Sequence, residues 1–213
     1  MSVSDEREKD HVVDLHFQLQ GKQIDVDHGY ALYGAISRVL ENAGNQWLHA
    51  ADDIGLVPVR GRYIGQGKLA LGRGARFGLR LPAGRIYKVL PLAGKPLEIN
   101  GDRFLVGTST TSLLKPAAAL YAHVVTTKNG EDESRFDEEI KRQLQSLGIR
   151  GKATRGPRRI VTVKEKKVVG YSLLVSELSA DESIRLQERG VGGRRKMGCG
   201  VFVPREGGNS REI

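Results

Sequence analysis

The spacing of apolar residues changes early in the chain. In residues 11–20 every second side chain is apolar, which predicts a strand with one buried face. In residues 28–43 the apolar side chains recur at helical spacing, with Asp27 as the expected N-cap and Gly44 just past the end. The fold is therefore expected to begin with a strand followed by a helix.

Weaker signals continue this pattern through the first half. Residues 54–60 and 77–81 predict two strands, and residues 85–92 predict a helical segment. Residues 96–107 predict a strand region with a turn at Asn100-Gly101. The element order expected for the first half is β-α-β-β-α-β.

The second half repeats this order. The expected elements are a strand over residues 117–127, a helix over 134–147, strands over 160–163 and 168–177, a helix from Ser179 to about Arg189, and a strand over 201–203. Ser179 and Glu182 form a capping-box pattern at the start of the second helix.

Two halves of this kind predict an α+β protein built from two tandem ferredoxin-like domains, with a glycine-rich loop near the C-terminus. The N-terminal domain is expected over residues 11–107, a linker over 108–116 and the C-terminal domain over 117–204. Residues 1–10 are expected to be a disordered tail, and residues 205–213 a second tail.

Positive charge is concentrated in two blocks of this chain of 213 residues, whose net charge is +9. Residues 60–88 carry eight Lys and Arg and no acid, and residues 150–167 carry eight against Glu165 alone. Cations gathered in blocks are typical of a protein that faces a polyanion. Nucleic acid is favoured over a membrane, because no apolar run approaches the roughly 18 residues of a spanning helix.

The remaining composition sets the expected compartment. The start of the chain has no apolar signal region, and a single cysteine excludes an internal disulfide and a Cys-pair zinc site. We therefore expect a cytoplasmic protein in which Cys199 is a small buried apolar residue.

A glycine-rich, cationic run lies near the C-terminus. Five of the eleven residues from 190 to 200 are glycine, and Arg194, Arg195 and Lys196 stand between them. The N–H groups of such a loop can form an anion-binding concavity, so the run predicts a phosphate site; a solvated surface turn is the alternative. The run follows a helix and lacks Gly-Lys-Ser/Thr, so a nucleotide-binding loop is not expected.

Two of the five histidines are candidates for acid–base chemistry. His28 begins the first predicted helix and His49 follows it, so one cleft can receive both rings, although each can equally have a structural role. His11, His16 and His123 lie on predicted strands and are expected to be structural. No spacing of His, Cys or carboxylates predicts a metal site, and no cofactor is expected.

Taken together, the two βαββαβ halves, the histidine in Trp47-Leu48-His49 and the loop at residues 190–203 resemble the CRISPR repeat-RNA endoribonucleases of the repeat-associated mysterious protein (RAMP) superfamily. The short myxococcal-type form is the most similar, and the resemblance spans about residues 12–204. It implies metal-independent cleavage of precursor CRISPR RNA, in which the 2′-OH attacks and leaves a 2′,3′-cyclic phosphate (or 3′-phosphate) and a 5′-OH.

The resemblance also assigns site residues. His49 matches the catalytic histidine of the family, and Ser37 falls where several members have a Tyr that assists at the 2′-OH. His28 is a second catalytic candidate, ranked below His49, or a residue that orients the chain. Many members have a Lys just after the histidine, where this chain has Asp52-Asp53, so Arg60 or Arg194 is expected to supply that charge. The residues expected to bind RNA are Arg60, Arg150, Lys152, Arg155, Arg158, Arg159, Gly190, Gly192, Gly193, Arg194, Arg195 and Lys196.

Two other functions fit parts of the pattern. A non-catalytic RAMP subunit would bind CRISPR RNA within a larger effector complex without cutting it. An unrelated RNA-binding protein would share only the charge. The expected partners are therefore CRISPR repeat RNA and, as a further option, other CRISPR-associated effector subunits, with no membrane.

Overall fold

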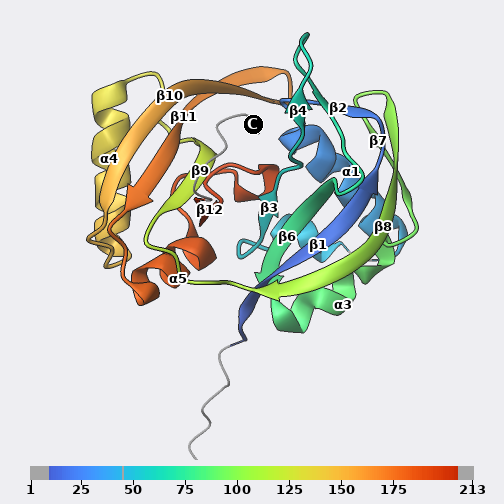
Figure 1. Ribbon diagram of the computed structural model, residues 1–213, viewed down its shortest axis with the longest axis horizontal. Helices are drawn as coiled ribbons and strands as arrows, with labels where there is room; N and C mark the ends of the chain where they lie inside the picture. The colour runs from blue at the N-terminus through green and yellow to red at the C-terminus, as the bar shows by residue number, and fades with distance from the viewer. Residues whose placement is uncertain (1–9, 45, 206–213) are drawn as a thin grey trace, which may run out of the picture.

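The computed structural model describes residues 10–44 and 46–205. The tails predicted for residues 1–10 and 205–213 lie outside the described residues, apart from Asp10 and Arg205. The described chain has the predicted α+β class, with its first and second halves lying side by side (Figure 1).

The first half forms a five-stranded antiparallel sheet with the order β3-β6-β1-β8-β7. Its strands are β1 (Val12–Gln20), β3 (Gly55–Val57), β6 (Arg76–Pro82), β7 (Pro96–Ile99) and β8 (Asp102–Leu113). Its helical elements are α1 (Gly29–Asn42), α2 (Trp47–Ala50) and α3 (Ile86–Val89), the last flanked by the 3-10 turns η1 (Ala83–Arg85) and η2 (Leu90–Leu92). The alternation predicted for β1 is confirmed, because Leu15 and Phe17 are buried in one core with Leu32 and Ile36 of α1.

The second half forms a four-stranded sheet with the order β10-β11-β9-β12. Its elements follow one another as β9 (Leu120–Val125), α4 (Glu133–Ser146), β10 (Lys152–Val163), β11 (Lys166–Ser176), α5 (Ala180–Arg189), the 3-10 turn η3 (Arg195–Met197) and β12 (Val203–Pro204). Phe136, Ile140 and Leu144 of α4 are buried in a second core, as their spacing predicts. The capping box of Ser179 and Glu182 at the start of α5 is likewise confirmed.

Three short strands form a separate sheet with the order β2-β5-β4, namely β2 (Gln23–Asp25), β4 (Arg62–Tyr63) and β5 (Lys68–Ala70). Figure 1 shows the β10–β11 hairpin, which we call the arm, reaching across to this small sheet. At the tip of the arm the backbone N–H of Thr162 donates a 2.7 Å hydrogen bond to Oδ2 of Asp27. The arm is therefore docked on the first half of the chain.

This contact corrects the predicted start of α1. The N-cap is His28, without a side-chain capping bond, and not Asp27. One carboxylate oxygen of Asp27 instead accepts from the arm, a contact across 135 positions of the chain. A local capping rule cannot anticipate a partner so distant in sequence.

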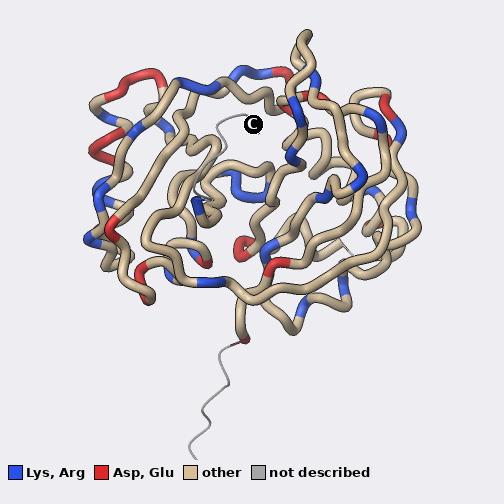
Figure 2. The backbone as a smooth tube through the Cα atoms, in the orientation of Figure 1, with Lys and Arg blue, Asp and Glu red and all other residues tan. Residues whose placement is uncertain are grey.

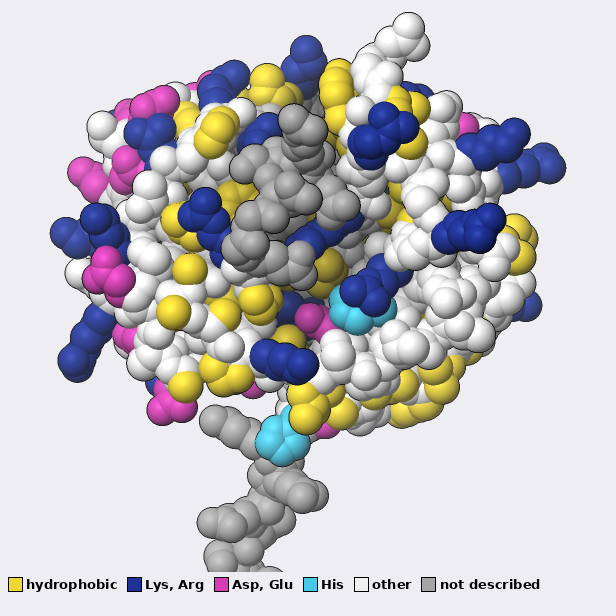
Figure 3. Space-filling model, in the orientation of Figure 1, with side chains coloured by type: hydrophobic (Ala, Val, Ile, Leu, Met, Phe, Trp, Pro, Cys, Tyr) yellow, Lys and Arg dark blue, Asp and Glu magenta, His cyan; other side chains and the backbone are white. Residues whose placement is uncertain are grey.

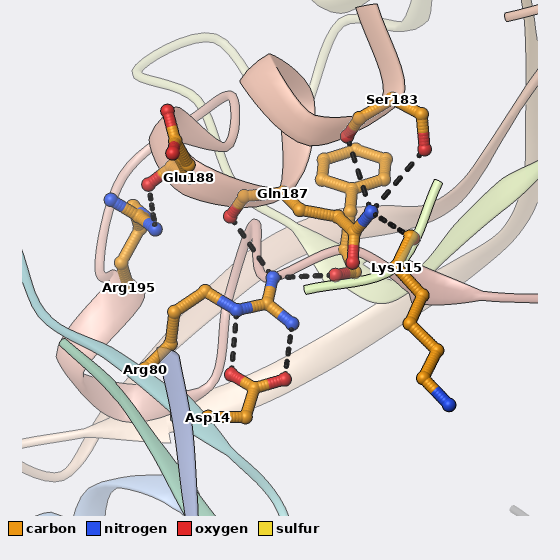
Figure 4. Close-up of polar contacts among 8 residues, drawn as sticks. Asp14, Arg80, Lys115, Ser183, Gln187, Glu188 and Arg195 are labelled. Atoms are coloured by element: carbon orange, nitrogen blue, oxygen red, sulfur yellow. Dashed lines mark hydrogen bonds and ion pairs between the residues drawn. The ribbon is translucent and has the colours of Figure 1, made fainter. Parts of the chain in front are cut away.

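Arg80 of β6 joins the two halves (Figure 4). Its side chain is completely buried and forms a two-bond ion pair with Asp14 of β1, at 2.7 and 2.8 Å. It also donates to the carbonyl oxygens of Gln187 and Phe202, at 3.0 and 2.6 Å. A buried arginine needs several acceptors, and these come from both halves. The end of α5 and the segment before β12 are thereby fixed against the first sheet.

Two predicted boundaries are wrong. Residues 108–113, expected to belong to a linker, continue β8 and pair with β1 as far as Leu113 opposite Val13. Strand β10 begins at Lys152, well before the expected residue 160. Both segments have many exposed polar or charged side chains, so their strands are defined by backbone pairing, which apolar periodicity does not report.

Candidate active site

His49 lies on α2 with both ring nitrogens in contact with side chains of α1. Its Nε2 is 2.5 Å from Oε1 of Glu41, and its Nδ1 is 3.1 Å from the hydroxyl of Tyr33. The His49 and Glu41 side chains are 58% and 37% exposed, so a large substrate can reach the ring. In the neutral ring, a carboxylate at Nε2 holds the proton there, and Nδ1 then accepts from Tyr33.

Tyr33 is held beside the imidazole by ring packing as well. The two rings meet edge to face, with centroids 5.9 Å apart. Burial is the largest of the influences that raise the pKa of Tyr33, so the phenol is protonated at neutral pH. Tyr33 is thus a hydrogen-bond donor to His49.

The glycine-rich loop supplies a cation to the same place. Nζ of Lys196, in η3, donates a 2.6 Å hydrogen bond to the backbone carbonyl oxygen of His49. An ammonium has three donors, so two are left for another acceptor. Lys196 is therefore the loop cation that contacts His49, whereas Arg60 or Arg194 was expected to supply charge at this site.

Close backbone packing explains the glycines of this loop. Gly190 and Gly200 have φ of +62° and +65°, and a Cβ on either would overlap a carbonyl oxygen of the loop itself. At the start of α1, a Cβ on Gly29 would overlap the carbonyl oxygen of Met197. Only glycine fits such contacts. Those of Gly190 and Gly200 close the loop on itself, and that of Gly29 holds the loop against α1.

The same packing corrects the predicted phosphate cradle. The N–H groups of Gly190 and Gly193 donate to backbone carbonyls, and that of Gly192 donates to the Gln143 side chain at 2.7 Å. These three glycines therefore do not present free N–H groups to a phosphate. Gly200, likewise, donates to the carbonyl oxygen of Val124.

The other two loop cations differ in their surroundings. Arg194 is exposed, and its guanidinium lies 3.4 Å from Oγ1 of Thr126. Arg195 points inward and donates to the carbonyl oxygen of Glu188 at 2.7 Å (Figure 4). Burial, together with the nearby charges of other arginines, lowers the pKa of Arg195 to about 10. Arg194 faces solvent, whereas Arg195 stabilises the end of α5.

The other two catalytic candidates are buried. His28 is 3% exposed, and its Nδ1 contacts the carbonyl oxygen of Asp25 at 2.7 Å while its Nε2 accepts from the N–H of Val59 at 3.0 Å. With both nitrogens bound to backbone, the ring is not placed to take a proton from a substrate. Ser37 is 4% exposed and lies one turn beyond Tyr33 in α1. Neither residue joins His49 at the surface.

The cations of β10 are partly neutralised by neighbouring acids. Arg155 forms ion pairs with Glu133 and Asp137 at 2.8 and 2.9 Å, and Arg158 pairs with Glu131 at 3.0 Å. Acidic segments beside this strand are visible near α4 in Figure 2, and acidic side chains gather on the same side of the face in Figure 3. Charge from the basic block is therefore less available here than the sequence implies.

Other predicted RNA-binding residues are open to solvent. Arg60, Arg150 and Lys152 are exposed, whereas Arg159 is half-buried. The Nε of Arg159 is buried without a hydrogen-bond partner among the described residues.

Cys199 is 1% exposed, as expected, and burial raises the pKa of its thiol to about 11. No helix in residues 10–44 and 46–205 is both long and apolar enough to span a bilayer. The same residues contain no group of three or more His, Cys, Asp or Glu side chains that could hold a metal ion.

Sequence reasoning did not identify Tyr33 and Glu41. Their signal is the helical spacing of α1, because positions 33, 37 and 41 are four residues apart and share one face. Ser37 was the only position of these three named as a candidate, but Tyr33 and Glu41, one turn before and one turn after it, carry the groups that touch His49.

Comparison with known proteins places this chain in a family. A family model described as Cas6 Crispr matches residues 13–207. The CRISPR-associated endonuclease Cas6 of Myxococcus xanthus (strain DK1622) is 42% identical over 192 residues, which cover 90% of this chain and 81% of that protein.

Solved structures share the fold at low identity. A Cas6-related protein from Pyrococcus furiosus has a TM-score of 0.66 at 14% identity and covers 92% of this chain and 100% of its own. Thermus thermophilus Cse3, bound to an RNA that represents a pre-cleavage complex, has a TM-score of 0.50 at 12% identity and covers 91% and 98%.

Proposed function

The chain belongs to the Cas6 family, and we propose that it is a CRISPR repeat endoribonuclease that cuts precursor CRISPR RNA within its repeats. The observation that carries the proposal is the exposed His49 ring, held between Glu41 and Tyr33, with Lys196 at its backbone carbonyl. The relative from Myxococcus xanthus, described as a CRISPR-associated endonuclease, supports the same activity.

Glu41 and His49 form the base. The carboxylate keeps the proton on Nε2, so Nδ1 carries the lone pair that accepts a proton. A repeat RNA places the 2′-hydroxyl of the nucleotide before the cut within reach of Nδ1. General-base catalysis of this kind contributes roughly 10²–10⁴-fold to the rate.

The reaction is an in-line transfer at phosphorus. The 2′-oxygen forms a bond to phosphorus as its proton moves to Nδ1 of His49, and the bond from phosphorus to the 5′-oxygen breaks. The phenol of Tyr33 gives its proton to the departing 5′-oxygen and recovers one from Nδ1, with which it is in contact. The products are a 2′,3′-cyclic phosphate and a 5′-hydroxyl.

Lys196 stabilises the charge that develops on the phosphorane oxygens. Its two remaining donors are suited to this because the His49 carbonyl fixes the third. The exposed cations Arg60, Arg150, Lys152 and Arg194 bind RNA phosphates away from the cut. His28 positions α1 and takes no part in proton transfer.

We also assign each half to a ferredoxin-like domain. In the second half the chain order is β9-α4-β10-β11-α5-β12. In the first half the order β1-α1-β3-β6-α3-β8 is equivalent, with β2, β4, β5 and β7 as additions. The boundary between the domains falls after Leu113, where β8 ends.

Incubation of the protein with RNA of the CRISPR repeat encoded next to its gene, in the presence of EDTA, tests the proposal. Wild type is expected to give one cut per repeat, with cyclic phosphate and 5′-hydroxyl ends identified by mass spectrometry. A 2′-deoxy substitution before the cut and the His49→Ala substitution should each abolish cleavage, whereas His11→Ala, which removes another exposed histidine, should not.

The outcomes separate the alternatives. Binding of repeat RNA without any cleavage by wild type would identify a non-catalytic RNA-binding subunit. Cleavage of the 2′-deoxy RNA would exclude the 2′-oxygen as nucleophile.

A further inference from the structure

A cavity of about 480 Å³ lies at the N-terminal end of α1. It is lined by side chains of both halves, including Asp25, Asp27, Tyr30 and Asn100 from the first half and Thr162 from the arm. Its volume lies within the range of roughly 300–1,000 Å³ that is usual for small-ligand sites. It is separate from the His49 contacts and has no role in the chemistry described above.

The position of Tyr30 connects this cavity to the cleavage site. Tyr30 precedes Tyr33 by three residues, so the two side chains lie one above the other on α1, about one helical turn apart. Glu41 falls on the same side of the helix. An RNA strand that continues from His49 toward the start of α1 would bring its next nucleotides to this cavity.

The lining has the two features by which proteins hold an unpaired base. Tyr30 is a half-buried aromatic ring suited to stacking. The polar groups around it include the carboxylates of Asp25 and Asp27, beside the amides of Gln66 and Asn100 and the hydroxyl of Thr162. Oδ2 of Asp27 is occupied by Thr162, but Oδ1 has no hydrogen-bond partner among the described residues.

The other acid of the cavity is already neutralised. Asp25 accepts from Nζ of Lys68 at 2.7 Å and from Nδ2 of Asn100 at 2.7 Å. The amide of Asn100 is thereby oriented with its nitrogen toward Asp25, so its oxygen is left as a second acceptor. A ligand with an amino group is preferred over one that presents only carbonyl oxygens.

On the basis of the proposed function, we propose that this cavity binds one unpaired nucleobase of the repeat, within two nucleotides of the cut, with Tyr30 stacked on the base and Asp27 accepting from its exocyclic amino group. Adenine, cytosine and guanine carry such a group and uracil does not. The cavity is therefore a specificity site, closed on one side by the docked arm.

Binding to a 2′-deoxy repeat RNA, which cannot be cut, tests the stacking. Each of the two nucleotides on either side of the cut is made abasic in turn. At one position the abasic RNA should bind wild type about 5- to 100-fold more weakly, as expected for loss of one stacked base. The same change should have almost no effect on Tyr30→Ala and its full effect on Tyr30→Phe.

The preference for an amino group is tested at the same position. Uracil should bind wild type about tenfold more weakly than cytosine, the size of one lost good contact to a base. Asp27→Ala should remove this preference. Asp27→Asn is the matched variant, because its amide oxygen can still accept from the N–H of Thr162 and keep the arm docked, while the free carboxylate acceptor becomes an amide donor, so the preference should also be lost.

The inference is overturned if, at every position, the abasic change weakens binding to Tyr30→Ala as much as it weakens binding to wild type. It is also overturned if Asp27→Ala keeps the preference for cytosine over uracil. Retention of the preference in Asp27→Asn would also overturn it. These are binding measurements on uncleaved RNA. A protein that binds and cuts repeats but lacks this coupling would contradict the base site alone, whereas one that neither binds nor cuts them would contradict the proposed function.

Discussion

Nζ of Lys196 and the carbonyl oxygen of His49 are 2.6 Å apart although 147 positions separate the two residues. The first half supplies the imidazole, and the glycine-rich loop of the second half supplies the cation. The candidate active site is therefore complete only when the two halves are packed together. Substitutions that leave each half intact but alter their packing should affect cleavage.

Lys196→Met should lower the rate of cleavage of bound RNA by about 10²- to 10³-fold, because one preorganised donor to the developing charge is lost. Lys196→Arg should recover part of the rate. Single-turnover cleavage at saturating protein measures this step apart from RNA binding. Lys164→Met, at the exposed tip of the arm, is the matched loss of one positive charge and should leave the rate constant within about twofold.

Arg80→Met should destabilise the protein by about 3–5 kcal/mol, because it leaves Asp14 and two carbonyl oxygens without their buried partner. Urea unfolding measures the change. Arg142→Met removes an arginine from an exposed surface pair with Glu139 and should have a much smaller effect, because such a pair is screened by solvent. Equal effects of the two substitutions would contradict the role of Arg80 as the joint between the halves.

Gly200→Ala should lower both stability and cleavage, because the new Cβ overlaps the carbonyl oxygen of Val191 and displaces the loop that carries Lys196. Gly65→Ala is the control. Its φ of +91° is also left-handed, but no heavy atom of the described chain lies within 4 Å of the added Cβ. Gly65→Ala should cost only about 1–2 kcal/mol, the strain of that backbone conformation, and should leave cleavage of bound RNA unchanged.

The free energy of unfolding should fall as the pH is lowered from 7 to 5. Burial, aided by the charge of Arg159, lowers the pKa of His123 from 6.5 to about 4. The folded state therefore favours the neutral ring, and the stabilisation is complete above pH 6.5 and is lost as the pH falls toward 4.

The contribution of His123 to the slope of the unfolding free energy against pH should approach about 1.4 kcal/mol per pH unit. His28, whose pKa is also lowered by burial, adds to it. The free energy of unfolding, measured at several pH values, should change less steeply with pH for His123→Gln than for wild type. An unchanged slope in His123→Gln would contradict this assignment.

Local patterns predicted much of the fold. The helix α4 follows from Phe136, Ile140 and Leu144, and the start of α5 follows from Ser179 and Glu182, because in each case the interacting groups lie within a few residues of one another. Strand lengths were predicted less well, since pairing partners are far apart in sequence. The polar end of β8 became a strand through its neighbour β1, and no pattern within the segment itself reports that neighbour.

The site was predicted in part for the same reason. His49 and the cationic loop were identified, but their meeting depends on a contact that neither segment encodes alone. His28 resembled a catalytic residue in sequence, yet its nitrogens are bound by Asp25 and Val59 in the folded chain. Burial of this kind is a property of the tertiary structure.

The order of synthesis gives the meeting of Lys196 and His49 a further consequence. On the ribosome, His49 with Tyr33 and Glu41 emerges long before the loop does. A nascent chain that ends before the loop contains His49 but not Lys196, and its Arg80 lacks the carbonyl partners of Gln187 and Phe202. A chain that ends before the loop, for example one translated from a truncated message, lacks Lys196, so under the proposed mechanism the transcripts around the ribosome meet no complete site until residues 190–203 have been translated.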